Sequence, residues 1–196
     1  MKFARLIPLL LVVAVLGVHA QTTKWKADKA HSQVRFSVSH MVIAEVTGRF
    51  KDFDVSLEQT ADDFTGSRLD AVIQSGSVNT DNEMRDKHLR SDDFLNAEKF
   101  PGITFKSTSF EKTGKDTYKI AGNLTIRDVT KPVVLDAIYN GSITDPMGNT
   151  RAGFKATTTI NRFDYGVKWN KAIEAGGLIA GENVEITLLM ELTKQK

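Results

Sequence analysis

The stretch HSQVRFSVSH, residues 31–40, decides the fold class because its side chains alternate between apolar and polar. Val34, Phe36 and Val38 occupy every second position, and polar residues lie between them. Successive side chains of a β-strand point to opposite faces, so a period of two predicts a strand with one apolar face. The stretch therefore indicates a sheet and not a bundle of helices.

The same alternation recurs along the rest of the chain, and turn residues separate the segments. The expected strands are residues 31–40, 47–58, 68–75, 102–110, 118–126, 132–139, 152–160 and 184–192. Residues 113–116, 145–149 and 176–177 carry the glycine, proline, asparagine and aspartate that favour turns. About eight antiparallel strands with short connections predict an all-β fold closed into a β-barrel, because closure removes exposed sheet edges.

Residues 80–90, TDNEMRDKHLR, break the alternation and predict one short charged helix between strands. Thr80, followed by Glu83 three residues later, has the pattern of a capping box. Three acid–base pairs four residues apart would support the helix, namely Asp81–Arg85, Glu83–Lys87 and Asp86–Arg90. We interpret most of these charged side chains as helix stabilisers.

Arg85, Asp86 and His88 are also the richest cluster of reactive side chains, and an enzyme would use His88 as a base oriented by a carboxylate. Helix stabilisation explains the same residues more simply, so we predict no catalytic residue and no enzymatic activity. The histidines beyond residue 20 show no metal-ligand spacing, and no metal or cofactor is expected. The chain has no cysteine, which excludes disulfides and thiol chemistry.

The first twenty residues have the pattern of a secretory signal peptide. Lys2 and Arg5 lead into an apolar run at residues 6–18, and a small-residue site ends at Ala20. The run is shorter than the ~20 residues that span a bilayer as a helix. We therefore expect cleavage after Ala20, with residues 21–196 forming one exported domain.

Removing the leader also removes Lys2 and Arg5 from the 26 basic residues, which leaves 24 against 24 acidic residues. A domain without net charge has no electrostatic attraction to phosphate backbones. Nucleic acid is therefore not an expected partner.

Three polar residues fall in the apolar phase of the strands. His40 follows the phase of Phe36 and Val38, while Arg162 and Asp164 continue the phase of residues 154–160. Two interpretations stay open. The three are satisfied groups at the core or rim, including an Arg162–Asp164 pair, or one of them orients the polar head of a ligand in an apolar pocket.

Several motifs resemble the YceI-like family. They are DKAHSQVRFSVSHM (residues 28–41), GRFKDFD (48–54), SVNTDNEMRDKHLRSDDFLNAEKFPGITFKS (77–107), GNLTIRDVTKPVVL (122–135) and INRFDYG (160–166). They occur in the family's order through nearly the whole chain beyond residue 20. The resemblance implies a periplasmic, lipocalin-like barrel that holds a polyisoprenoid in its interior, with no known cofactor or metal and no agreed catalytic residues. Matching framework positions are His31, Phe36, His40, Phe50, Arg85, Asp86, His88, Phe94, Phe105, Leu124, Arg162 and Asp164.

The expected function is a periplasmic binding or carrier protein for an isoprenoid-type lipid, either a polyisoprenoid, a quinone or a prenyl phosphate. Transient membrane contact would allow lipid exchange, and a homodimer stays open. The residues expected at the ligand are Phe36, Val38, His40, Phe50, Phe94, Phe105, Leu124, Phe154, Ala156, Arg162 and Asp164. The alternatives are a cell-envelope enzyme acting on a lipid or amide through Arg85, Asp86 and His88, and a stress-response structural barrel without ligand.

Overall fold

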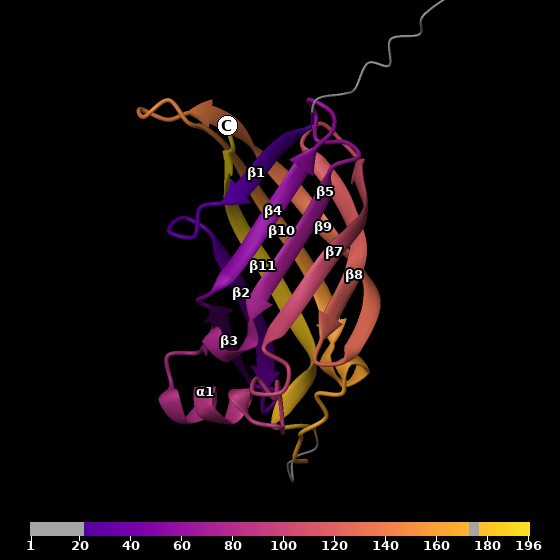
Figure 1. Ribbon diagram of the computed structural model, residues 1–196. Coiled ribbons are helices and arrows are strands. Elements are labelled where there is room, and N and C mark those ends of the chain that lie inside the picture. Colours follow the sequence, from indigo (N-terminus) through magenta and orange to yellow (C-terminus); the bar gives the residue numbers. More distant parts are fainter. Residues whose placement is uncertain (1–21, 173–176) are drawn as a thin grey trace, which may run out of the picture.

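The computed structural model describes residues 22–172 and 177–196, which form one antiparallel sheet closed into a barrel (Figure 1). The expected signal peptide lies outside the described residues. The strands are β1 (Thr23–Ala27), β2 (Gln33–His40), β3 (Ala44–Phe50), β4 (Phe53–Gln59), β5 (Arg68–Gln74), β6 (Val78–Asn79), β7 (Gly102–Lys112), β8 (Thr117–Ile126), β9 (Val129–Thr144), β10 (Thr150–Asn161) and β11 (Ala180–Lys194). Helix α1 (Glu83–Arg90) and two 3-10 turns, η1 (Ser75–Ser77) and η2 (Arg162–Tyr165), complete the described elements. The predicted all-β barrel with one short helix is confirmed.

Closure occurs along β11, which pairs with β1 near its end and with β2 along the rest of its length. The ring runs β1-β4-β5-β7-β8-β9-β10-β11 and returns to β1, which makes eight strands. Along β11, the residues that pair with β2 come directly before those that pair with β1, so β1 and β2 together occupy one strand position of the barrel, with a break between them. β3 and β4 form another, because β3 pairs with β2 and β4 pairs with β1.

The prediction of a single strand over residues 47–58 is wrong, because β3 ends at Phe50 and β4 begins at Phe53, which leaves a break between them. At the break, the backbone N–H of Lys51 donates to the Ser77 carbonyl oxygen at 3.1 Å, and that of Asp52 donates to the Ser77 hydroxyl at 3.1 Å. Two ladder donors are thereby withdrawn from strand pairing. β1 and β6 were not predicted, since five and two residues carry too little alternation.

The inward-facing side chains of the strands form the core. Among them stands one glycine, Gly122, where a larger residue would clash. The ring of Phe105 lies over Gly122, which pairs across from Ser107 on β7. A Cβ at position 122 would overlap that ring and lie 2.6 Å from the Lys106 carbonyl oxygen. Gly122 therefore lets β7 and β8 pack closely beneath an aromatic side chain.

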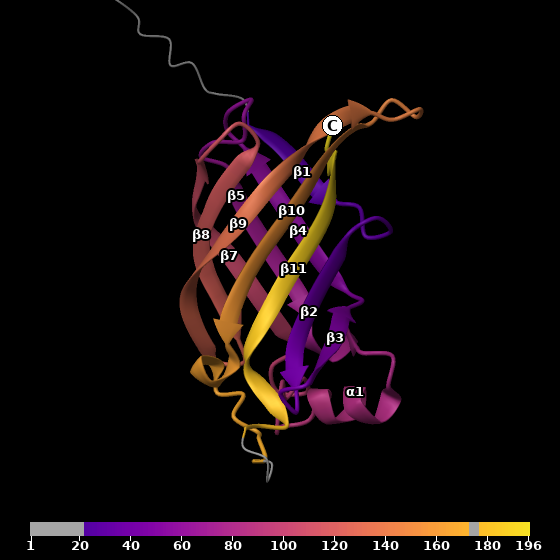
Figure 2. The same ribbon diagram turned by 180° about the vertical axis from the view of Figure 1, so that it is seen from behind.

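Helix α1 lies at the lower end of the barrel, beside the end of the β2–β3 hairpin (Figures 1 and 2). The predicted capping box is wrong, because Asp81 takes a left-handed φ of 56° and the helix begins later. Asn82 is the N-cap, and its side chain accepts from the Arg85 N–H at 3.0 Å. The three predicted acid–base pairs form no ion pair among the described residues. Within residues 22–172 and 177–196, no helix has the length and apolar character needed to span a membrane.

Candidate functional site

The barrel contains a cavity of about 360 Å³, and its wall is almost entirely apolar. Alternate residues of β11, from Val184 to Leu192, face this cavity, as do Phe154, Ala156 and Ile160 of β10. The alternation in the sequence therefore places one side chain in two on the inside. The inward side chains do not fill the barrel, and the space left has the size of a small-ligand pocket.

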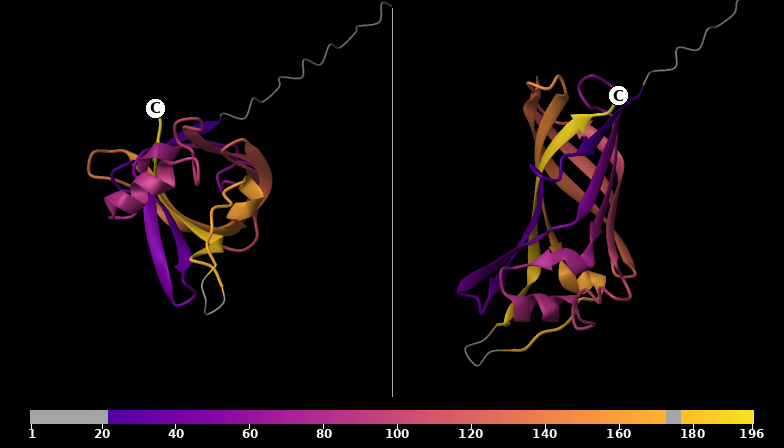
Figure 3. Two further views of the ribbon diagram at one scale, coloured as in Figure 1. Left: turned by 90° about the horizontal axis from the view of Figure 1, so that it is seen from below. Right: turned by 60° about the vertical axis from the view of Figure 1, so that its left-hand side comes forward.

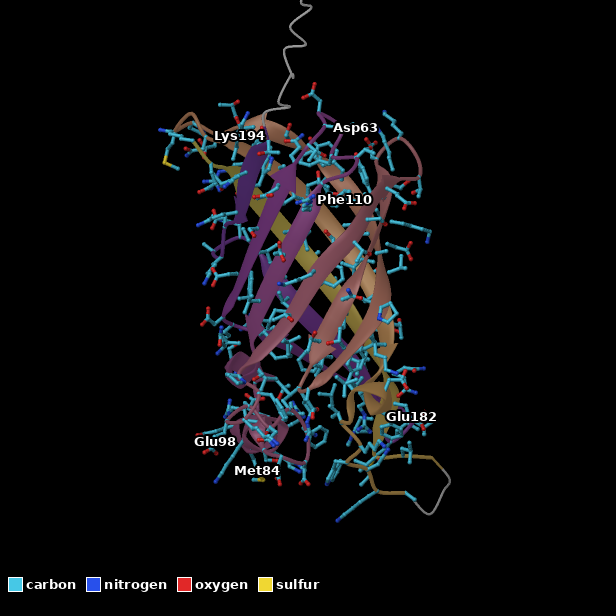
Figure 4. The ribbon with its side chains drawn as sticks, turned by 45° about the vertical axis from the view of Figure 1, so that its right-hand side comes forward. Asp63, Met84, Glu98, Phe110, Glu182 and Lys194 are labelled. Carbon is cyan, nitrogen blue, oxygen red and sulfur yellow. The ribbon has the colours of Figure 1, made fainter. Side chains whose placement is uncertain are left out.

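A cluster of aromatic side chains closes the upper end of the barrel. The Phe64 ring centroid lies 5.1 Å from that of Phe154, 5.3 Å from that of Tyr139 and 5.8 Å from that of Trp25. The Tyr118 hydroxyl donates to the Asp63 carbonyl oxygen at 2.7 Å. Figure 4 shows Asp63 and Phe110 at this end. Packed rings of this size leave the other end as the entrance to the cavity.

Besides Arg35, which is exposed on β2, the charged and imidazole residues of the cavity wall are His40, Arg85, His88 and Arg162, and these four gather toward the lower end. The His88 side chain is 42% exposed and still lines the cavity, so the cavity meets solvent here. Seen from below, α1 and the β2–β3 hairpin lie at the rim of this end (Figure 3, left). We call this end the mouth.

Arg162 is a buried cation whose partners are backbone carbonyl groups. Its guanidinium donates to the carbonyl oxygens of Val167 at 2.7 Å, Gly181 at 2.8 Å, Trp169 at 2.9 Å and Ala180 at 3.0 Å. Burial lowers the pKa of Arg162. No carboxylate among the described residues forms an ion pair with it. The mouth therefore carries a positive charge that neutral dipoles hold in place, and one of the five guanidinium N–H donors has no partner among the described residues.

His88 is held at the mouth by a carboxylate and by two aromatic rings. Its Nε2 lies 2.8 Å from Asp93 Oδ2. The rings of Phe94 and Trp169 meet the imidazole edge to face, with centroids 4.9 and 5.0 Å away. These contacts fix the ring plane, and a fixed imidazole beside an apolar cavity is suited to orienting a polar ligand group.

Ten of the eleven predicted ligand residues line the cavity, namely Phe36, Val38, His40, Phe50, Phe94, Phe105, Leu124, Phe154, Ala156 and Arg162. Asp164 does not; it is exposed, and it forms no pair with Arg162. The cause is the end of β10 at Asn161, after which the chain turns into η2. The strand phase therefore cannot be extended to residue 164. Contact of the ten residues with a ligand stays a prediction.

Besides Phe110 on β7, two aromatic residues of the wall were missed in the sequence, Tyr165 and Trp169. Both follow the end of β10, where no alternation gives their direction. Burial raises the pKa of Tyr165 to about 12. Its hydroxyl has no hydrogen-bond partner within the described part of the chain. The alternation of apolar and polar residues along β10 could not have predicted that they face the cavity, because their positions depend on the turn η2.

The residues of the alternative catalytic cluster do not act on one another. Asp86 is buried and accepts from the Thr80 N–H at 2.8 Å and hydroxyl at 2.6 Å, and Arg85 Nε donates to the Thr80 hydroxyl at 2.7 Å. His88 instead contacts Asp93. The interpretation of Asp86 as a partner of Arg90 is therefore wrong, and its carboxylate is committed to the chain just before α1.

Comparison with known proteins identifies the family. The family model described as the YceI-like domain matches residues 25–192. The chain belongs to the YceI-like family. This YceI-like chain is 37% identical over 172 residues to a UPF0312 protein of Staphylococcus aureus (strain N315), covering 87% of the chain and 98% of that relative.

Solved structures of similar proteins agree with the YceI-like barrel. The YceI protein of Campylobacter jejuni is 32% identical, with a TM-score of 0.70 over 86% of this chain and 96% of that one. BcnA of Burkholderia cenocepacia, at 19% identity, has a TM-score of 0.74 over 84% and 98% of the two chains. A polyisoprenoid binding domain from Saccharophagus degradans, at 17% identity, has a TM-score of 0.63 over 87% and 98%. The last two similarities concern the fold alone.

Proposed function

We propose that this protein is a periplasmic carrier that holds an isoprenoid-type lipid, with the tail in the barrel and the polar end at the mouth. The observation that carries the proposal is the apolar cavity with its charged side chains gathered at one end. Apolar walls with a few polar groups are typical of sites that bind and orient one ligand. The single-domain reading of residues 21–196 and the export by a signal peptide belong to the same proposal.

The affinity for the tail follows from burial. At ~0.8 kcal/mol per buried carbon, each five-carbon unit that leaves water contributes about 4 kcal/mol before the costs of binding. A lipid that leaves a bilayer gains far less, because bilayer and cavity are similarly apolar. The contacts of the head group at the mouth therefore decide whether the protein extracts the lipid.

The polar end of the ligand would meet Arg162 and His88. Arg162 supplies a positive charge and an N–H donor that no other described residue accepts, while His88 is fixed by Asp93. Both side chains favour a head group with oxygen acceptors, such as a phosphate or a quinone carbonyl. The fold is shared with the polyisoprenoid binding domain of S. degradans, which supports an isoprenoid tail.

Native mass spectrometry of protein purified without detergent tests the proposal. Wild-type protein is expected to carry an added lipid mass. Ala156→Trp, which places an indole inside the cavity, should remove that mass. Lys155→Trp is the matched control, because Lys155 is the neighbouring residue on β10 and is exposed. Repeated recovery of empty wild-type protein would reject the carrier and favour the structural barrel.

The same material tests the enzyme alternative. His88→Ala is expected to leave the tail in the cavity and to change only the preference for the head group. An activity on a lipid or amide substrate that is lost in His88→Ala, with the bound lipid mass unchanged, would support the enzyme instead.

A further inference from the structure

The tip of the β2–β3 hairpin exposes three consecutive apolar side chains. Met41 is 41% exposed, Val42 66% and Ile43 90%, and Ala44 begins the next strand. No charged residue lies within this tip, which we define as residues 41–43. Single exposed apolar residues are common on protein surfaces, but a run of three at a turn is not explained by packing.

The backbone of the tip is strained. Met41 and Val42 adopt φ angles of 50° and 69°, in the left-handed region. Turns that need this conformation usually contain glycine, asparagine or aspartate, and a β-branched residue is a rare outlier there. The turn therefore exposes apolar surface and also stores backbone strain. Features of this kind concentrate at functional sites.

The tip lies directly beside the mouth. The Met41 N–H donates to the Ile179 carbonyl oxygen at 3.0 Å, and His40 Nδ1 lies 3.0 Å from the same oxygen. His40 and Ile179 both line the cavity, as does Val38, which lies two residues before His40 on the same face of β2. Apolar surface therefore continues from the tip into the cavity. Figure 3, right, shows the hairpin projecting beyond the barrel wall at this end.

The surroundings of the tip match the surface of a bilayer. Lys171 is exposed, and its carbonyl oxygen accepts from the Ile179 N–H at 3.0 Å, which places a basic residue near the tip. Met84 of α1, 83% exposed, points away from the barrel at the same end (Figure 4). Apolar side chains that enter the acyl boundary and lysines that meet lipid phosphates are a recurrent combination at membranes.

We propose that residues 41–43 are a membrane-docking tip that inserts into the bilayer surface and sets the mouth against it. The inference rests on the proposed carrier function, because a tail that passes directly from bilayer to cavity never becomes exposed to water. A bilayer explains the tip better than a second copy of the chain does, since the proposed cargo is a membrane lipid and a lysine lies near the tip.

Sedimentation with phosphatidylcholine vesicles tests the docking tip. Wild-type protein should bind, and Ile43→Asp should weaken binding at least about tenfold, because it removes a large apolar side chain and brings a charge to the membrane. The matched control is Ile143→Asp, at a 67% exposed isoleucine of the β9–β10 hairpin at the other end of the barrel. It should bind like the wild type.

A second variant measures insertion directly. Brominated lipids in the vesicles should quench the fluorescence of Ile43→Trp more than that of the wild type, in which Trp25 and Trp169 set the baseline, whereas Ile143→Trp should show no added quenching. Equal vesicle binding by the wild type and Ile43→Asp, or no wild-type binding, overturns the inference. Self-association of the wild type that Ile43→Asp abolishes, without vesicle binding, would assign the tip to a dimer and also overturn it.

The lipid content of the same proteins separates this inference from the carrier function. If the wild-type protein carries lipid but does not bind vesicles, the docking tip alone is rejected. Wild-type protein that binds vesicles through the tip but is always empty would reject the carrier alone.

Discussion

At the scale of single residues, Arg162 shows how a buried charge is tolerated without a carboxylate. Four hydrogen bonds to carbonyl oxygens offset its desolvation, and they tie the segment after η2 to the start of β11. A guanidinium suits this role because its donors lie in a rigid plane and point in several directions. The residue therefore shapes the mouth as well as charging it.

Arg162→Lys tests this role. An ammonium group has three donors and cannot reach all four carbonyl oxygens, so buried acceptors lose their partners. We expect the free energy of unfolding to fall by about 2–4 kcal/mol, measured by urea denaturation. Arg49→Lys, at an exposed position on β3, is the control and should change little. An unchanged stability of Arg162→Lys would mean that water replaces the lost donors.

At the scale of elements, side-chain hydrogen bonds hold α1 to β6 and Thr80, and one buried carboxylate accepts three of them. Asp86 is buried, and besides Thr80 it accepts from the Asn79 side-chain amide at 3.2 Å. None of the three acid–base pairs that the sequence suggested for this helix forms within the described residues. What positions α1 at the mouth is thus a contact to β6 and the residue after it, and not the helix's own charge pattern.

Asp86→Ala should release α1 while the barrel stays folded. The Thr80 N–H and hydroxyl and the Asn79 amide lose their acceptor, at a cost of about 1–3 kcal/mol for each group that stays buried. Hydrogen exchange should accelerate in α1 and β6 and stay slow in β9–β11. Glu83→Ala, at an exposed site of the same helix, should have little effect. Uniform acceleration through all strands would contradict local release.

At the scale of the whole molecule, one ionic cluster fastens loops from distant parts of the chain. Arg151 Nε lies 2.6 Å from Asp145 Oδ2, and its Nη1 lies 2.7 Å from Asp28 Oδ2 and also contacts Glu191. Asp28, His31 and Glu191 place potential metal-ligand atoms within 4.8 Å of one another, but Arg151 already engages both carboxylates. The cluster therefore serves to join the β1–β2 loop, the β9–β10 turn and β11.

Acid should weaken this fastening within a defined window of pH. The Arg151 guanidinium lowers the pKa of Asp145 to about 2, and hydrogen bonds from His31 and then Arg151 lower the pKa of Asp28 further. Both carboxylates have an unfolded pKa of ~3.9. Their stabilisation is complete above about pH 4 and is lost as the pH falls toward 2.

Arg151→Met should raise the midpoint of acid unfolding toward pH 4. Circular dichroism from pH 7 to pH 2 measures this midpoint. Lys119→Met removes an exposed partner of Asp136, 2.8 Å away, and serves as the control. It should leave the midpoint unchanged because exposed pairs contribute little. A midpoint that is the same in both variants would show that the cluster does not govern acid stability.

The sequence by itself determined most of the strands, their inward faces and the resemblance to the family. Alternation is a local property with a period of two, so Phe36 and Ala156 could be assigned to the interior from their neighbours alone. The same reasoning failed at Asp164, because a strand's phase ends where the strand ends. Local charge spacing also failed at Asp86, whose partners come from the chain before the helix.

Only the tertiary structure decided that the barrel is hollow, that one end is closed by aromatic rings, and that the mouth holds Arg162 and His88. These properties depend on how side chains from eight strands meet across the interior. Such contacts join residues far apart in the chain, and no pattern of neighbouring residues encodes the volume that they leave.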